Sequence, residues 1–135
     1  MERYLLPEDI KVYCITASSF PDGVLAAHQQ LHTLLPFSVE RRYFGLSRPE
    51  NGTIEYHAAA AELIPGELSD KGLKEILIPA GHYNMITVHN YMQHTAAIGE
   101  AFQQLIAVPG IDPQGYCVEW YITRESVHCM VRLQA

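Results

Sequence analysis

Residues 23–35 read GVLAAHQQLHTLL, and residues 96–108 read AAIGEAFQQLIAV. In both stretches the apolar residues recur at the three- and four-residue spacing of a helix that packs one face against a core. The tripeptide Gln29-Gln30-Leu31 of the first returns as Gln103-Gln104-Leu105 of the second, an offset of 103 − 29 = 74 residues. The two stretches therefore predict two equivalent helices.

Strand-like runs flank the two predicted helices in the same order. One run precedes each helix and two follow it: 9–17, 41–47 and 53–63 around the first, 74–90, 116–123 and 126–133 around the second. Runs rich in β-branched and aromatic residues with alternating polarity are typical of strands. We expect an α+β fold in which two pseudo-symmetric strand-helix-strand-strand modules, roughly residues 8–63 and 73–134, form an antiparallel sheet with two helices and a groove between the modules.

Length, composition and charge narrow the class of protein. The 135 residues fit one domain, residues 1–135, and 48% hydrophobic with 18% charged residues is the composition of a globular chain. The sequence has no apolar run of the roughly 18 residues that a membrane helix needs, and its first residues do not resemble a signal peptide. A formal net charge of -6 argues against direct nucleic-acid binding, and three cysteines without C-x-x-C spacing indicate reduced thiols. We expect a soluble, cytoplasmic protein that binds neither membranes nor nucleic acid.

The C-terminal hairpin contains the residue most suggestive of function. A turn at Arg124-Glu125 would pair Trp120 with Cys129, which places one apolar face of the hairpin under a helix. The opposite face would then carry four polar or polarisable side chains, Glu119, Tyr121, His128 and Met130.

Glu119 interrupts a strand of valine, tryptophan and tyrosine, where glutamate fits poorly. Two interpretations remain open: the face of Glu119 is solvated, or Glu119 lines a cavity with Tyr121 and Met130. In a cavity, a carboxylate among aromatic and thioether groups would attract an organic cation.

The sequence contains no recognisable metal-binding or catalytic motif. His28 and His32 have a spacing that can place two imidazoles on one helix face, but no third ligand has a fitting local spacing, so no metal is expected. The sequence has no G-x-S-x-G, phosphate-loop or H-E-x-x-H motif, and no cofactor is expected. Catalytic residues are not assigned.

Ile78-Pro79-Ala80-Gly81-His82-Tyr83 resembles the IPAG-x-Y strand of the gyrase-inhibitor-like small-molecule-binding family. That family also supplies the effector-binding domains of bacterial AraC-type and MerR-type transcription activators. Glu119-Trp120-Tyr121 stands where the family has an E-x-Y segment, and the doubled strand-helix-strand-strand layout fits as well.

The resemblance implies two modules around a groove that binds a small, aromatic or cationic compound. It implies Glu119 as counter-ion and Tyr121 as a wall of that groove. Further candidate ligand-binding residues are Tyr43, Phe44, Tyr56, Trp120 and Met130. The first expected strand begins about ten residues into the chain, so we expect a stand-alone effector-binding domain without a DNA-binding domain of its own.

Other functions compete with this interpretation. Some stand-alone relatives hydrolyse electrophilic toxins, and Glu119 would be the base that activates water in such an enzyme. The family's gyrase-inhibiting name implies a protein-inhibitor or partner-binding role. The protein partner could also be a second copy of this chain, which would make a homodimer. Haem binding, known for a related fold, would need an axial histidine that the sequence does not single out.

Overall fold

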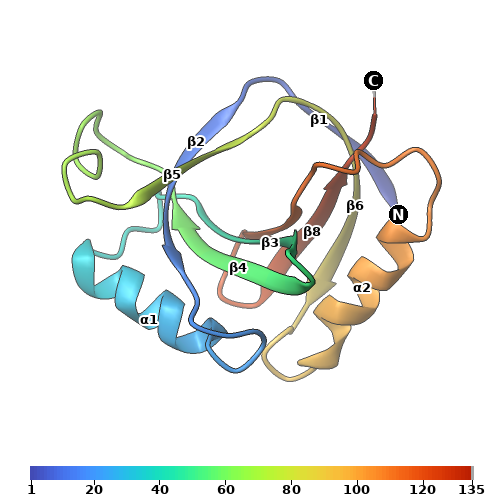
Figure 1. Cartoon of the computed structure of the whole chain (residues 1–135), viewed down its shortest axis with the longest axis horizontal. Helices are drawn as coiled ribbons and strands as arrows, with labels where there is room; N and C mark the ends of the chain where they lie inside the picture. Colours follow the sequence, from blue (N-terminus) through green and yellow to red (C-terminus); the bar gives the residue numbers. More distant parts are fainter. Residues whose placement is uncertain (135) are drawn as a thin grey trace.

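The alternating and helix-periodic stretches form an α+β fold in the computed structural model, which describes residues 1–134 (Figure 1). The elements in chain order are β1 (Glu2–Leu6), β2 (Ile10–Thr16), α1 (Val24–Leu34), β3 (Tyr43–Glu50), β4 (Thr53–Ala60), β5 (Lys74–Ile78), β6 (Gly81–His89), α2 (Ala96–Ile106), β7 (Cys117–Tyr121) and β8 (Ser126–Arg132). Neither helix is long and apolar enough to cross a membrane.

The eight strands form one antiparallel sheet in the order β1-β6-β8-β7-β3-β4-β2-β5. Exchanging β1 with β5, β2 with β6, β3 with β7 and β4 with β8 gives the same order read from the opposite edge of the sheet. The two halves are therefore related by a pseudo-twofold axis between β3 and β7, which confirms the predicted repeat.

The helices pack on one face of the sheet, which we call the helix face (Figure 1). Helix α1 packs on β2 and β4, and α2 packs on β6 and β8. The leucines of the repeated tripeptide, Leu31 and Leu105, are both fully buried, as are Ala27 and Ala101 one turn earlier. The repeated sequence is thus the contact surface of each helix.

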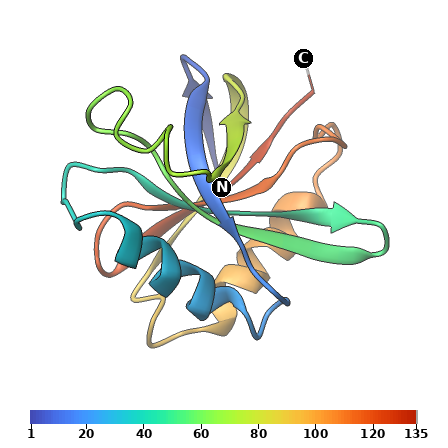
Figure 2. The same cartoon turned by 60° about the vertical axis from the view of Figure 1, so that its left-hand side comes forward.

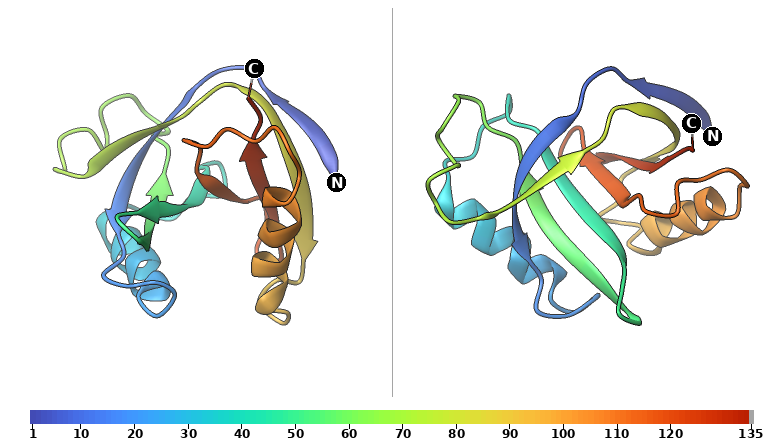
Figure 3. Two further views of the ribbon diagram at one scale, coloured as in Figure 1. Left: turned by 45° about the vertical axis from the view of Figure 1, so that its right-hand side comes forward. Right: turned by 45° about the horizontal axis from the view of Figure 1, so that its top comes forward.

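The opposite face, which we call the inner face, holds the largest hydrophobic cluster. Figures 1, 2 and 3 show the sheet curling so that β1, β2 and β5 arch across the side away from the helices, and the cluster fills the inner face of this curled sheet. Phe44, Leu46, Val118 and Met130 are core residues of the cluster, and Trp120 packs against it.

The structure contains two strands more than the sequence predicts. The run 74–90, expected as one strand, is two strands, β5 and β6, that break at Pro79-Ala80. The first strand begins at Glu2 instead of about ten residues into the chain. Strand β1 pairs with β6 of the other half and β5 with β2, so each half contributes one edge strand to the other.

The IPAGHY segment, residues 78–83, forms the bend between β5 and β6. The Asp9 carboxylate accepts a hydrogen bond from the Ala80 backbone N–H at 2.7 Å, and Arg132 Nε donates to the Ala80 carbonyl at 2.9 Å. Gly81 has φ of 137°, and a Cβ there would lie 3.0 Å from the Arg132 guanidinium. A residue other than glycine would therefore be strained at this bend.

The hairpin of β7 and β8 has a different register from the predicted one. Glu119 pairs with Cys129 and Trp120 with His128, one residue away from the expected pairing of Trp120 with Cys129. A slip of one residue exchanges the faces of one strand relative to the other. Glu119 therefore lies on the helix face with Cys129, and Met130 lies on the inner face with Trp120, which corrects the prediction that Glu119 and Met130 share a face.

Candidate ligand-binding site

Glu119 lies at the pseudo-twofold axis of the sheet. It is on β7, directly opposite Gly45 of the neighbouring β3, and the two positions are related by the offset of the repeat, since 119 − 45 = 74. A Cβ on residue 45 would lie 2.6 Å from Glu119 Oε1 and would overlap the Tyr56 hydroxyl. The absence of a side chain in the first half thus makes the space that the glutamate of the second half occupies.

Two tyrosine hydroxyls donate hydrogen bonds to Glu119 Oε1. Tyr56 of β4 donates at 2.9 Å, and Tyr121 of β7 donates from two residues along the same strand. Glu119 is only 9% exposed, and no basic group of residues 1–134 forms an ion pair with it. Burial raises the pKa of Glu119, and the two tyrosine hydrogen bonds offset part of that increase.

His28 connects helix α1 to this carboxylate. Its Nε2 lies 2.7 Å from the Tyr56 hydroxyl oxygen. Tyr56 has a single hydroxyl hydrogen, which it donates to Glu119, so the hydrogen of this bond belongs to His28 Nε2. Burial, with a contribution from nearby His32, lowers the pKa of His28 to about 4, so the imidazole is neutral at pH 7.

Aromatic rings from both halves surround the carboxylate. Phe20, in the loop before α1, stacks on Tyr56 with ring centroids 5.9 Å apart. The ring centroid of Tyr91, in the loop before α2, lies 5.6 Å from that of Tyr121, and His28 and Tyr121 form a T-shaped pair with centroids 5.6 Å apart. A buried anion within a cluster of aromatic rings is a good environment for an organic cation.

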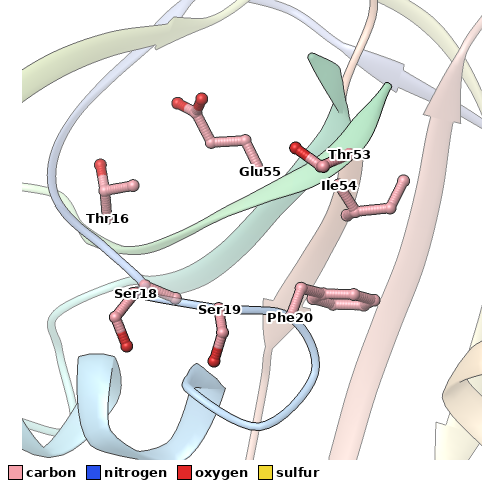
Figure 4. Close-up of a pocket in the computed structure, with 8 residues that line it drawn as sticks. Thr16, Ser18, Ser19, Phe20, Thr53, Ile54 and Glu55 are labelled. Carbon is pink, nitrogen blue, oxygen red and sulfur yellow. The ribbon is translucent and has the colours of Figure 1, made fainter. Parts of the chain in front are cut away.

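Glu119 lines neither of two hollows on the surface. The larger one has a volume of about 420 Å³ and is lined by Thr16, Ala17, Ser18, Ser19, Phe20, Thr53, Ile54 and Glu55 (Figure 4). Because Phe20 both lines this hollow and stacks on Tyr56, the hollow begins one ring away from the Glu119 network. The second, of about 180 Å³, lies on the inner side beside Trp120 and Tyr4.

The structure brings together three of the residues singled out from the sequence, Glu119, Tyr121 and Tyr56. Tyr43 lies on the same face but packs against His32 and Phe37, with ring centroids 4.9 and 5.7 Å away. The remaining three, Phe44, Trp120 and Met130, lie on the inner face, behind the sheet from Glu119.

Three residues of the network were not predicted from the sequence: Phe20, His28 and Tyr91. The spacing of His28 and His32 suggests only a possible metal pair, but the two imidazoles have different partners, the Tyr56 hydroxyl and the Tyr43 ring. Residues 1–134 contain no cluster of three or more histidine, cysteine, aspartate or glutamate side chains placed for a metal. The one available signal was position, because Phe20 and Tyr91 each lie in the loop that leads into a repeated helix.

Solved structures share this fold at low sequence identity. An integron cassette protein, VCH_CASS2, from the mobile metagenome of Vibrio cholerae, is 12% identical, with a TM-score of 0.73 over 98% of this chain and 95% of that one. SAV2435 bound to tetraphenylphosphonium is 14% identical, with a TM-score of 0.61 over 98% of this chain and 94% of that one. No protein-family model and no curated protein matches the sequence. What the chain shares with these structures is therefore its fold.

Proposed function

We propose that this protein is a binding module for small organic cations with aromatic groups, with Glu119 as the counter-ion and Tyr56 and Tyr121 as walls. We further propose that it is a member of the gyrase-inhibitor-like family and acts as an effector-binding domain. The observation that carries the proposal is the burial of Glu119 at the axis of the sheet with two phenol donors and no basic partner among residues 1–134.

An ionised carboxylate without a counter-charge is costly to bury. In the empty site this cost raises the pKa of Glu119. A bound cation would remove the cost by supplying the missing charge, and the rings of Tyr56, Tyr121, Phe20 and Tyr91 would add attraction through their quadrupoles. The site therefore favours a cation over a neutral or anionic ligand of the same shape.

The comparison with SAV2435 supports this choice of ligand class. That protein has the same fold and was solved bound to tetraphenylphosphonium, a cation that carries four aromatic rings. In this chain such a ligand needs the rings around Glu119 to part, and Phe20, which is 46% exposed beside the larger hollow, is the wall with the most room to move.

Two ions of nearly equal shape and opposite charge test the proposal: tetraphenylphosphonium and tetraphenylborate. In a thermal-shift titration, the phosphonium is expected to stabilise the wild type, by about 2.7 kcal/mol at a hundred times its dissociation constant, and the borate is not. Glu119→Gln should lose the phosphonium response, whereas Glu125→Gln, which changes an exposed glutamate of the β7–β8 loop, should keep it.

The affinity of the wild type should also increase with pH through the raised pKa of Glu119, because only the ionised carboxylate pairs with the cation. Equal affinity of wild type and Glu119→Gln for the phosphonium, or equal stabilisation by the borate, would contradict the proposal.

A further inference from the structure

A second set of polar side chains lies away from Glu119, where β2 and β4 pair. Thr16, the last residue of β2, is the direct cross-strand partner of His57 on β4. Thr16 Oγ1 lies 2.9 Å from His57 Nδ1, and His57 Nε2 lies 3.1 Å from Glu55 Oε1. With the imidazole hydrogen on Nε2, His57 donates to the carboxylate and its Nδ1 accepts the threonine hydroxyl hydrogen. A hydroxyl, an imidazole and a carboxylate are thus joined in series.

This series opens onto the larger hollow of the surface. Thr16 and Glu55 both line the 420 Å³ hollow, and Thr16 is exposed, whereas His57 is 1% exposed. Figure 4 shows the side chains of Thr16 and Glu55 on one side of β4 and those of Phe20 and Ile54 at the other end of the hollow. Phe20 and Ile54 are 46% and 42% exposed, so the hollow has an apolar wall at one end and an accessible hydroxyl at the other.

The second half of the chain contains a matched copy of part of this series. Thr87 Oγ1 lies 2.8 Å from His128 Nδ1, and the two residues are 41 apart in the sequence, as Thr16 and His57 are. Among residues 1–134, however, no carboxylate forms an ion pair with His128, and neither Thr87 nor His128 lines one of the two hollows. The threonine–histidine bond belongs to the repeated framework, whereas the ion-paired carboxylate and the 420 Å³ hollow lie beside the copy in the first half.

The charges around His57 keep its imidazole neutral near pH 7. Burial lowers the pKa of His57 most, and Lys74 of β5 and Arg48 of β3 lower it further. Glu55 and Glu50 act in the opposite direction. A neutral imidazole is the form that can accept a proton from Thr16.

We propose that Thr16, His57 and Glu55 form a second site, which cleaves small esters with an apolar group. Thr16 Oγ1 bonds to the carbonyl carbon as its hydroxyl proton passes to His57 Nδ1. The ester C–O bond then breaks, and the leaving alcohol takes the proton from His57. In the second step of the reaction, water attacks the acyl-threonine, which releases the carboxylic acid and restores the threonine hydroxyl. Thr16 and His57 are the catalytic residues, and Glu55 is a positioning residue that fixes the imidazole and stabilises its protonated form.

The test is hydrolysis of p-nitrophenyl acetate by the full chain, together with labelling by an alkyl fluorophosphonate and peptide mapping of the labelled residue. Thr16→Val and His57→Gln are expected to lower kcat/KM by roughly a hundredfold or more, and Thr16→Ser to retain activity. The matched controls Thr87→Val and His128→Gln, which change the copy without the carboxylate, should keep the wild-type rate. The phosphonate should be found on Thr16.

Glu55→Gln separates positioning from structure. Because Glu55 raises the pKa of His57, the variant should lower the plateau rate and shift the acidic limb of the pH–rate profile to lower pH. Thermal unfolding of every variant identifies those that fail to fold. The site does not depend on the proposed function at Glu119. Equal rates for Thr16→Val, Thr87→Val and the wild type, no wild-type rate above buffer, or phosphonate attached to another residue would each overturn the proposal.

Discussion

At the scale of single residues, the site depends on one difference between equivalent positions. The repeat places Gly45 of β3 and Glu119 of β7 opposite each other at the pseudo-twofold axis. If both halves carried glutamate there, two carboxylates would be buried side by side, and like charges opposite each other destabilise a sheet. One glutamate and one glycine instead give a single charge in a space large enough for two tyrosine donors.

Gly45→Ala tests this arrangement directly. Its Cβ would overlap the Tyr56 hydroxyl and lie 2.6 Å from Glu119 Oε1, so the network must shift. We expect a loss of about 1–3 kcal/mol in the free energy of unfolding, measured by urea denaturation. Gly99→Ala is the control: no atom lies within 4 Å of its new Cβ, and alanine in a helix should stabilise by about 0.5–1 kcal/mol. If Gly45→Ala were as stable as Gly99→Ala, the close approach at the axis would be wrong.

His28 should make stability depend on pH. Its pKa is lowered by burial to about 4, whereas in the unfolded chain it is about 6.5, so between these values the unfolded chain binds more protons. Stability contributed by His28 is therefore present above pH 6.5 and is lost as the pH falls toward 4, by about 2 kcal/mol between pH 7 and pH 5.

The measurement for His28 is urea denaturation of wild type and His28→Gln at a series of pH values. Between pH 7 and pH 5 the wild type should lose about 2 kcal/mol of unfolding free energy relative to His28→Gln, because glutamine does not titrate. A difference between wild type and His28→Gln that stays constant with pH would contradict the buried, neutral imidazole.

At the scale of elements, the sequence predicts the helices well and the C-terminal hairpin poorly. The expected helices at 23–35 and 96–108 become Val24–Leu34 and Ala96–Ile106, because a buried leucine stripe specifies a helix locally. The hairpin register depends instead on the turn. Ile122 and Thr123 N–H groups both bond to the Ser126 carbonyl, and the Thr123 hydroxyl accepts from the N–H groups of Glu125 and Ser126. This longer turn replaces the expected two-residue one.

The turn determines which of the predicted site residues share a face with Glu119. The alternation along each strand is as predicted, but the one-residue shift places Met130 on the face opposite Glu119, together with Trp120. Tyr121 lies two residues from Glu119 on the same strand, so alternation alone predicts that the two side chains share a face. Tyr56 is 63 positions away and reaches Glu119 only because β4 pairs with β3 and β3 pairs with β7. Periodicity along one segment contains no information about such pairings, so the contact of Tyr56 with Glu119 could not be predicted.

At the scale of the whole molecule, the two halves are interlocked. Strand β1 of the first half pairs with β6 of the second, and β5 of the second pairs with β2 of the first. Tyr56 and His28 come from the first half and Glu119 and Tyr121 from the second, so the candidate site is complete only when the halves meet. We propose on this basis that residues 1–135 form one domain whose modules are not independent.

Separate expression of residues 1–72 and 73–135 tests that proposal. Each fragment alone lacks the strand that its partner supplies, so we expect neither to show cooperative thermal unfolding by circular dichroism. An equimolar mixture should restore a cooperative transition and the stabilisation by tetraphenylphosphonium, because it rebuilds the β3–β7 pairing that brings Tyr56 to Glu119.

Gly45 and Glu119, the residues at the axis, also determine which fragments associate. A homodimer of the second fragment would pair β7 with β7 and bury Glu119 against a second Glu119, and a homodimer of the first would leave an empty space between two copies of Gly45. Only the mixed pair fills the space with one charge, so mixing should displace any homodimer detected by gel filtration. A fragment of residues 73–135 that unfolds cooperatively as a monomer would show instead that the second half is a domain of its own.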